Sequence, residues 1–336
     1  LGFSNPSAMA CSPDGKSLCI ASFGGNELSL INRDKLHEKI ENSRFSPGLQ
    51  KSESNDFSTD LFFMSAIQRQ RIPLPGYGPN SLVFSGNALY IAEYFSGTLA
   101  VADLTESPVN VHHQMGLGKE SGQDMVRFGE MLFNNADLCY QHWQSCATCH
   151  PDGRMDGLNW DLLNDGIGNP KNTKSMLHAH KTPPSMSLGV RATAEDAVRA
   201  GIRYIQFAAV KEQQARAIDV YLQSLTPLPS PFLVNNKPGK SAKRGKVIFE
   251  REGCVDCHPA PIYTDLKKYN VNSGKNMEKE NAFDNPALVE VWRTAPYLHD
   301  GSAKTMDELI AVHNPHGTNT MTPDERKDLI EFVLSL

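Results

Sequence analysis

The chemistry of this sequence is concentrated in two C-x-x-C-H motifs, CATCH at residues 146–150 and CVDCH at residues 254–258. Two cysteines three positions apart can form thioethers with the two vinyl groups on one porphyrin edge. The histidine that follows then points its imidazole at the iron. The motifs therefore predict two covalently bound haem c groups. The predicted attachment and ligand residues are Cys146, Cys149 and His150 for the first haem and Cys254, Cys257 and His258 for the second.

A zinc site built from the two C-x-x-C pairs is the alternative interpretation of these four cysteines. It would leave His150 and His258 without a role, and each motif is embedded in the sequence pattern of a cytochrome domain. The haem interpretation is therefore favoured. Because haem attachment requires reduced cysteines and an export-side ligation system, we expect an exported protein in the periplasm or on the cell surface.

Three further cysteines, Cys11, Cys19 and Cys139, lie outside the motifs, and their odd number predicts at least one free thiol or a partner outside the chain. Cys11 and Cys19 are expected on neighbouring strands, where small buried cysteines are common, so two thiols are favoured over a disulfide. The sequence begins at Leu1 without a signal peptide. We therefore expect either a signal that has been removed or a start within a longer gene product.

Charge and hydropathy exclude two classes of partner. The 336 residues carry a formal net charge of −5, and no run of Lys or Arg forms a stripe, so nucleic acid is not expected to bind. No apolar stretch approaches the roughly 18 residues that cross a bilayer, so no membrane span is predicted.

The elements before the motifs form an internal repeat of β-structure. Residues 5–31 and 78–102 both give a strand, a turn, a second strand, a turn containing glycine and a third strand. Such units resemble the blades of surface-layer-type (YVTN-like) β-propellers. We therefore interpret residues 1–115 as an incomplete propeller of about two blades. The remaining blades are expected upstream of Leu1, because two blades cannot close a ring.

Two further expectations concern this part of the chain. Residues 41–60, rich in Ser and Asn, are predicted to be an insertion loop. A small β-sheet packed on the haem domains is the alternative to the propeller.

The elements around the two motifs repeat a helical plan. Residues 124–133 have helical periodicity before the first motif, and residues 212–225 carry an apolar stripe after it. Beyond a proline-rich linker, residues 244–249 and 324–336 repeat the two helices around the second motif. The predicted fold class is therefore mixed: N-terminal all-β propeller-like blades, then two mainly α cytochrome c domains at 120–228 and 238–336.

Residues 120–336 resemble the bacterial dihaem cytochrome c peroxidase family, which includes the MauG-type enzymes. The resemblance extends beyond the haem motifs to the segments NPKNT at 169–173, TAPYLHDG at 294–301 and KTMDEL at 304–309. It implies a reactive first haem, a second haem that relays electrons, and a calcium ion between the domains. The implied calcium ligands are the Asn172 side chain and the Thr294 and Pro296 carbonyl groups, an oxygen shell that suits a hard cation.

The resemblance also implies a second ligand to the electron-transferring haem. The matching position is His313, within AVHNPH at 311–316, with His316 as the less favoured alternative. A His–His pair is expected to give that haem a lower reduction potential than a His–Met pair.

Three departures from the family concern the first haem. Residues 186–191 lack the Trp expected between the haems, and Asn164 falls near the histidine that caps the reactive haem at rest. Residues 201–207 lack the catalytic Glu, which makes Gln206 a distal candidate; His180, downstream of the first motif, is the other. A five-coordinate resting haem, open to peroxide or oxygen, is therefore expected.

The first interpretation is a peroxidase-like oxidoreductase that reduces hydrogen peroxide with electrons from a small redox protein, a cytochrome or a cupredoxin. The second is a MauG-like or oxygenase-type enzyme that oxidises a protein or polymer substrate, with peroxide or dioxygen as the oxidant. The third is a non-enzymatic electron-transfer cytochrome, which would require two six-coordinate irons.

Overall fold

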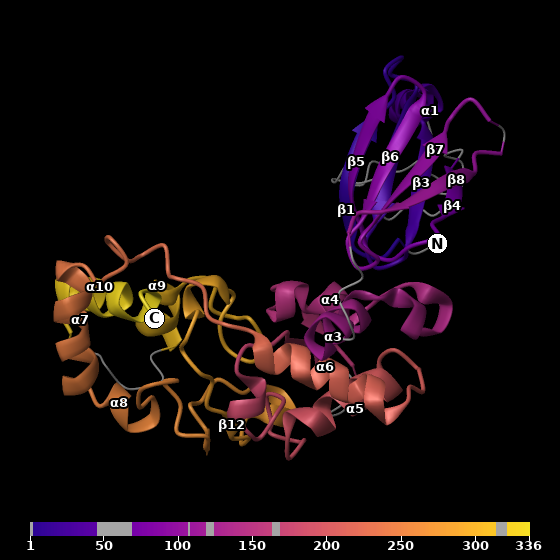
Figure 1. Ribbon diagram of the computed structural model, residues 1–336. Coiled ribbons are helices and arrows are strands. Elements are labelled where there is room, and N and C mark those ends of the chain that lie inside the picture. Colours follow the sequence, from indigo (N-terminus) through magenta and orange to yellow (C-terminus); the bar gives the residue numbers. More distant parts are fainter. Residues whose placement is uncertain (1–2, 46–68, 107, 119–123, 163–168, 314–320) are drawn as a thin grey trace. The chain divides into compact units, whose positions relative to one another are not determined.

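The computed structural model of the protein describes residues 3–45, 69–106, 108–118, 124–162, 169–313 and 321–336. The chain divides into two compact units. The first contains Leu1–Arg127 and Met131–Ser145, and the second contains Phe128–Glu130 and Cys146–Leu336. The first unit holds the long β-strands and the second most of the helices, as Figure 1 shows.

The first unit contains two four-stranded antiparallel sheets, with the strands of each sheet in chain order. The first sheet consists of β1 (Pro6–Cys11), β2 (Ser17–Ser22), β3 (Glu27–Asn32) and β4 (Arg69–Pro73), and the second of β5 (Pro79–Ser85), β6 (Ala88–Glu93), β7 (Thr98–Asp103) and β8 (Val111–Gly116). The three strands predicted in each repeat are confirmed. Each sheet also has a fourth strand that was not predicted. Two sheets do not close a ring, and the propeller stays a prediction.

The two sheets share one apolar core. Alternate residues of the central strands point into it, among them Ala21, Leu89 and Ala100, all fully buried. The Ser7 hydroxyl of β1 donates a hydrogen bond to the Pro79 carbonyl of β5, with an O–O distance of 2.6 Å. This contact joins the first strands of the two sheets.

Two local expectations for the first unit can be compared with the structure. The predicted loop at residues 41–60 is wrong at its start, because helix α1 (Arg33–Phe45) continues to residue 45; residues 46–60 lie outside the described residues. The Asn32 side chain accepts a hydrogen bond from the Lys35 amide and so helps to start this helix. Cys11 and Cys19 lie on β1 and β2 as free thiols, and burial raises the pKa of Cys19 to about 12.

The second unit contains two copies of one helical plan. The first copy consists of the part of α3 (Met125–Asn134) that belongs to this unit, α4 (Cys146–Cys149), α5 (Ala194–Tyr204) and α6 (Glu212–Ser224). The second consists of α7 (Lys240–Arg251), α8 (Cys254–Cys257), α9 (Met306–Glu308), the π-turn η8 (Leu309–His313) and α10 (Pro323–Leu334). The helices predicted before and after each motif are therefore confirmed.

A glycine lets the first and last helices of each copy approach closely. A Cβ atom on Gly129 of α3 would lie 1.8 Å from the Ala217 carbonyl oxygen of α6. A Cβ on Gly245 of α7 would lie equally close to the Asp328 carbonyl oxygen of α10. The two helix pairs therefore cross in the same way, and α7 and α10 lie side by side in Figure 1.

The loops between the helices repeat as well. The two-residue strands β9 (Asn159–Trp160) and β10 (Lys171–Asn172) pair like β11 (Lys268–Tyr269) and β12 (Phe283–Asp284). The short turns η5 (Ala179–Lys181) and η7 (Val291–Arg293) follow at equivalent places. Isolated bridges join Ser185 to Arg191 and Tyr297 to Ala303. From β10 and β12 onward, equivalent residues are 112 positions apart.

Within the described part of the chain, no helix has the length and apolar character that crossing a membrane requires.

Candidate functional site

The second C-x-x-C-H motif forms α8 and ends at a buried histidine. The His258 Nδ1 atom lies 2.8 Å from the Tyr263 carbonyl oxygen, so this nitrogen carries the proton and Nε2 carries the lone pair that can bind a metal. Burial raises the pKa of the Cys254 thiol to about 11. The Asn285 side-chain Nδ2 donates to the Cys257 carbonyl group and holds the end of the motif. The motif is thus fixed in a geometry in which both sulfurs and one imidazole can act together.

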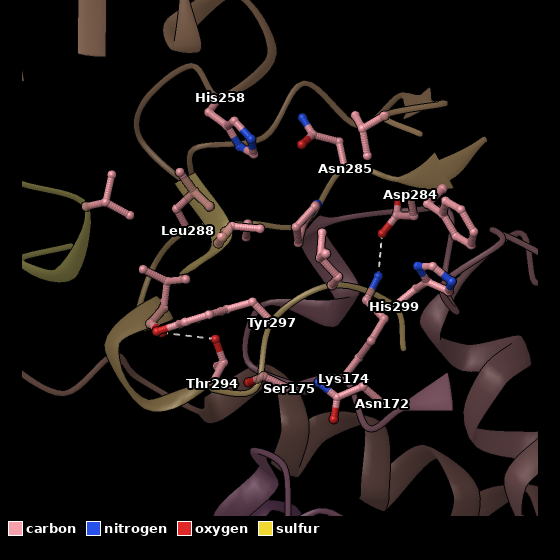
Figure 2. Close-up of a pocket in the computed structure, with 18 of the residues that line it drawn as sticks. Asn172, Lys174, Ser175, His258, Asp284, Asn285, Leu288, Thr294, Tyr297 and His299 are labelled. Carbon is pink, nitrogen blue, oxygen red and sulfur yellow. Dashed lines mark hydrogen bonds and ion pairs between the residues drawn. The ribbon is translucent and has the colours of Figure 1, made fainter. Parts of the chain in front are cut away.

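A cavity of about 500 Å³ lies next to this motif. Its walls carry Cys254, Cys257 and His258 on one side and apolar side chains from the surrounding helices, including Phe249, Leu309, Ile310, Leu329 and Val333. Figure 2 shows His258, Leu288 and Tyr297 on the walls of the cavity. An apolar pocket of this size with two thiols and an imidazole fits a covalently attached porphyrin.

The predicted second iron ligand, His313, ends the π-turn η8, which begins with the cavity residues Leu309 and Ile310. The side chain of His313 lies outside the described part of the chain, as does all of His316. Both ligand assignments stay predictions.

The first motif repeats the same local geometry on α4. The His150 Nδ1 atom lies 3.1 Å from the Arg154 carbonyl oxygen. Burial lowers the pKa of His150, which favours the neutral imidazole that a metal needs. Burial and the nearby Asp156 carboxylate raise the pKa of the Cys149 thiol to about 11. The two predicted haem histidines thus share the same second contact, a backbone carbonyl group a few residues downstream.

Gln206 lies beside the first motif. Its side-chain Nε2 atom is 3.4 Å from the Cys146 sulfur, and only 4% of the residue is exposed. Its Oε1 atom is buried without a hydrogen-bond partner among the described residues. The structure therefore places Gln206 at the attachment edge of the first predicted haem, and its role as a distal group stays a prediction.

His180, the other distal candidate, is buried beside an ion pair of Asp219 and Arg199. Its Nε2 atom lies 3.2 Å from the Asp219 Oδ1 atom, and the Arg199 guanidinium donates to the other carboxylate oxygen at 2.7 Å. The His180 Nδ1 atom is buried and has no hydrogen-bond partner in the described residues. The imidazole is thus held in place from one side and offers one nitrogen to another group.

The three predicted calcium ligands line the same cavity. The Asn172 Nδ2 atom lies 2.5 Å from the Pro296 carbonyl oxygen, and Asn172 Oδ1 is buried without a partner among the described residues. Turning this amide by 180° would bring two oxygen acceptors together, an arrangement that needs a cation between them. The donor set therefore fits a hard metal ion. The Thr294 hydroxyl donates a hydrogen bond to the Val291 carbonyl oxygen, with an O–O distance of 3.1 Å.

The buried ion pair of Arg154 and Glu290 was not predicted. Their two hydrogen bonds measure 2.8 and 3.0 Å, and the Glu290 carboxylate also accepts from the Leu228 amide. Burial raises the pKa of Glu290, but the bonds from Arg154 and Leu228 outweigh it and hold the pKa below its usual value. The backbone of Glu290 has a φ of 60°, a conformation that no sequence pattern predicts for glutamate.

A second unpredicted pair lines the cavity. The Lys174 ammonium contacts the Asp284 carboxylate on β12. Burial raises the pKa of Asp284, while the Lys174 ammonium lowers it. Nearby, His299 stacks on Phe283 with ring centroids 3.9 Å apart and lies 3.4 Å from the Glu278 carboxylate.

Comparisons with known proteins agree with the helical half of the fold. Residues 242–336 match the Cytochrome c family. Hydrazine synthase subunit gamma of Kuenenia stuttgartiensis is 26% identical, with 63% of this chain and 78% of that protein covered. The methylamine utilization protein MauG of Methylophilus methylotrophus is 24% identical, with 63% and 82% covered. A cytochrome c551 peroxidase of Pseudomonas aeruginosa is 22% identical, with 65% and 80% covered.

Two solved structures share the fold. Hydrazine synthase from Kuenenia stuttgartiensis superposes with a TM-score of 0.58 at 24% identity, covering 64% of this chain and 88% of that chain. A MauG-like protein associated with microbial copper homeostasis gives 0.53 at 17% identity, covering 66% and 91%. The chain thus contains a cytochrome c domain, the domain type that binds haem c covalently. Its relatives support a haem-containing oxidoreductase of the cytochrome c peroxidase and MauG-like class.

Proposed function

We propose that the protein is a dihaem, peroxidase-like oxidoreductase that reduces hydrogen peroxide to water with two electrons and two protons. The observation that carries the proposal is the repetition of the haem-binding geometry. Each C-x-x-C-H motif presents its histidine with Nδ1 bonded to a downstream carbonyl oxygen, at Arg154 and at Tyr263. Each motif also belongs to a helical copy closed by a glycine crossing. Two haems, one in each of the domains 120–228 and 238–336, account for both copies.

Haem c, when bound, supplies an iron that binds small ligands and exchanges single electrons. The chain orients it. His150 and His258 each present Nε2, and apolar side chains line the pocket next to His258. We assign the substrate to the first site and electron relay to the second, where His313 is the proposed second ligand. A cation at Asn172, Thr294 and Pro296 would hold the two domains together.

Proton transfer at the first site is assigned to His180, and Gln206 is assigned a distal hydrogen-bonding role. The Asp219 carboxylate fixes the His180 imidazole by its Nε2 atom, leaving the buried Nδ1 to hold or pass a proton. Gln206 supplies a buried carbonyl oxygen beside Cys146. The electrons come from a small exported redox protein, a cytochrome or a cupredoxin. We place the reaction in the periplasm or on the cell surface, with residues 1–115 as propeller-like blades.

The test uses the purified holoprotein. Its mass should include two haem groups, and the double variant Cys146→Ser/Cys149→Ser should retain one. The resting spectrum should contain a high-spin haem that changes on adding peroxide, and peroxide should be consumed in the presence of a reduced small cytochrome. Two low-spin haems inert to peroxide would instead identify a plain electron-transfer cytochrome.

The similarity to MauG favours a second candidate function, oxidation of a protein or polymer substrate by the same haem pair. The two candidate functions differ in the source of the electrons, which can be measured. Under the first function, peroxide turnover requires the reduced small redox protein. Under the second, peroxide or dioxygen is consumed with an added protein or polymer alone, and the product carries the oxidation.

A further inference from the structure

Asn172 and Asp284 occupy equivalent positions in the two copies, on β10 and β12. Their backbone amides make equivalent bonds to the opposite copy. The Asn172 amide donates to the His299 carbonyl oxygen at 2.7 Å, and the Asp284 amide donates to the Ser187 carbonyl oxygen at 2.8 Å. Since His299 and Ser187 are also 112 positions apart, these two hydrogen bonds between the copies are related by approximate twofold symmetry.

The symmetry extends to the residues of the candidate cation site. Pro296, whose carbonyl oxygen contacts Asn172, and Thr294 correspond to Pro184 and Thr182 in the first copy. Thr182, Ser187 and Asp284 line the same cavity as Asn172, Thr294 and Pro296. The cation site at Asn172 therefore has a counterpart at Asp284, built from the same two loops with the copies exchanged.

The counterpart already contains a positive charge. The Lys174 ammonium contacts the Asp284 carboxylate, as the dashed line in Figure 2 shows, and the Asp284 side chain is only 6% exposed. The residue equivalent to Lys174 in the other copy is Pro286, which has no charge. At the Asn172 site the described residues supply a buried, unpartnered oxygen instead. The Asp284 site thus has its own cation, the Lys174 ammonium, whereas the Asn172 site has metal-binding oxygen atoms alone.

We propose that Asp284, Thr182 and Pro184 form a second cation site whose cation is the Lys174 ammonium. By the symmetry, the donors are the Asp284 carboxylate and the Thr182 and Pro184 carbonyl oxygens, the equivalents of Asn172, Thr294 and Pro296. Oxygen donors of this kind suit hard cations, so removal of the ammonium leaves a site for a divalent ion such as Ca²⁺. The buried carboxylate needs a positive partner, and only one of the two symmetric sites depends on added metal. This inference deepens the proposed calcium assignment and can be tested separately from it.

The experiment measures the number of Ca²⁺ ions bound per holoprotein by equilibrium dialysis after chelation. The unchanged protein should bind one ion, and Asn172→Ala should bind none; these two results test the calcium assignment. Lys174→Met should bind two, and Lys174→Met/Asp284→Asn should bind one. Lys268→Met removes a nearby lysine whose Nζ contacts the Leu188 carbonyl oxygen at 3.3 Å, and it should leave the number unchanged.

A second variant allows for a folding defect in Lys174→Met. Lys174→Gln keeps a hydrogen-bond donor toward Asp284 without the charge, and it should also gain one ion. If the unchanged protein binds no Ca²⁺, a single ion bound by the Lys174 variants and lost with Asp284→Asn still supports the second site. A Lys174 variant with an intact haem spectrum that gains no ion would overturn the proposal.

Discussion

The Arg154 guanidinium and the Glu290 carboxylate form a buried, two-point ion pair between the two copies of the second unit, with side chains 7% and 1% exposed. The Arg154 carbonyl oxygen also accepts from His150. A residue that orients the first predicted haem ligand is thus anchored by a carboxylate of the second copy. The same guanidinium donates to the Thr226 carbonyl oxygen in the linker at 2.9 Å. The ion pair therefore couples the position of His150 to the contact between the copies.

Glu290→Gln should destabilise the holoprotein by about 3–5 kcal/mol, because it leaves the Arg154 charge buried without its partner. The measurement is denaturant unfolding followed by circular dichroism. The matched control is Glu250→Gln, which removes an exposed carboxylate 4.0 Å from Lys246 and should cost at most about 0.5 kcal/mol. Equal effects of the two substitutions would contradict a structural role for the buried pair.

Gly245→Ala should destabilise the α7–α10 crossing by about 1–3 kcal/mol, because the new Cβ would overlap the Asp328 carbonyl oxygen. Gly129→Ala should have a similar effect at the equivalent crossing. The control is Gly201→Ala in α5, where no atom lies within 4 Å of the new Cβ. That substitution should stabilise the protein by about 0.5–1 kcal/mol through helix propensity. Thermal unfolding of the three variants checks the order, and a stabilised Gly245→Ala would refute the close crossing.

The sequence predicted those parts of the molecule that depend on local patterns. Alternating apolar residues indicated β2 and β6, and the helical stripes indicated α6 and α10, because each pattern matches the period of its element. The fourth strands were missed for local reasons. β4 follows a long insertion, and β8 contains the polar run His112, His113 and Gln114, which interrupts any apolar alternation.

The sequence could not predict the contacts that join the two copies. Glu290 stands in an apolar segment and Lys174 in a polar one, and neither pattern indicates a partner. Their partners Arg154 and Asp284 lie more than 100 residues away. The left-handed backbone of Glu290 is stabilised by this tertiary setting and has no glycine to indicate it. Resemblance to a family named Asn172, Thr294 and Pro296, yet only the structure brings Asn172 and Pro296 into contact and relates them to Asp284 and Pro184.

His180→Gln should reduce peroxide turnover by about 10²–10⁴-fold, the usual contribution of a general acid or base. Asp219 keeps its hydrogen bond from Arg199, and the optical spectrum of the resting haems should stay unchanged. The control is His142→Gln, whose side chain is 62% exposed beside Asp137 and which should not alter turnover. An unchanged kcat/KM in a folded His180→Gln protein would remove His180 from the mechanism.

Glu325 gives the stability of the last helix a defined pH dependence. Its carboxylate accepts from the Thr322 amide at 2.9 Å and from Arg251 at 2.6 Å, and these bonds lower its pKa from 4.5 to about 2. A carboxyl group whose pKa is lowered by folding stabilises the protein above pH 4.5, and this stabilisation is lost as the pH falls toward 2.

Glu325→Gln should therefore unfold at lower urea concentration than the unchanged protein at pH 6. The difference should shrink below pH 4.5 and disappear near pH 2. At 1 M NaCl the Arg251 contribution is screened while the Thr322 bond persists, so part of the difference should remain. A difference between the two proteins that stays constant from pH 6 to pH 2 would refute the capping role of the carboxylate.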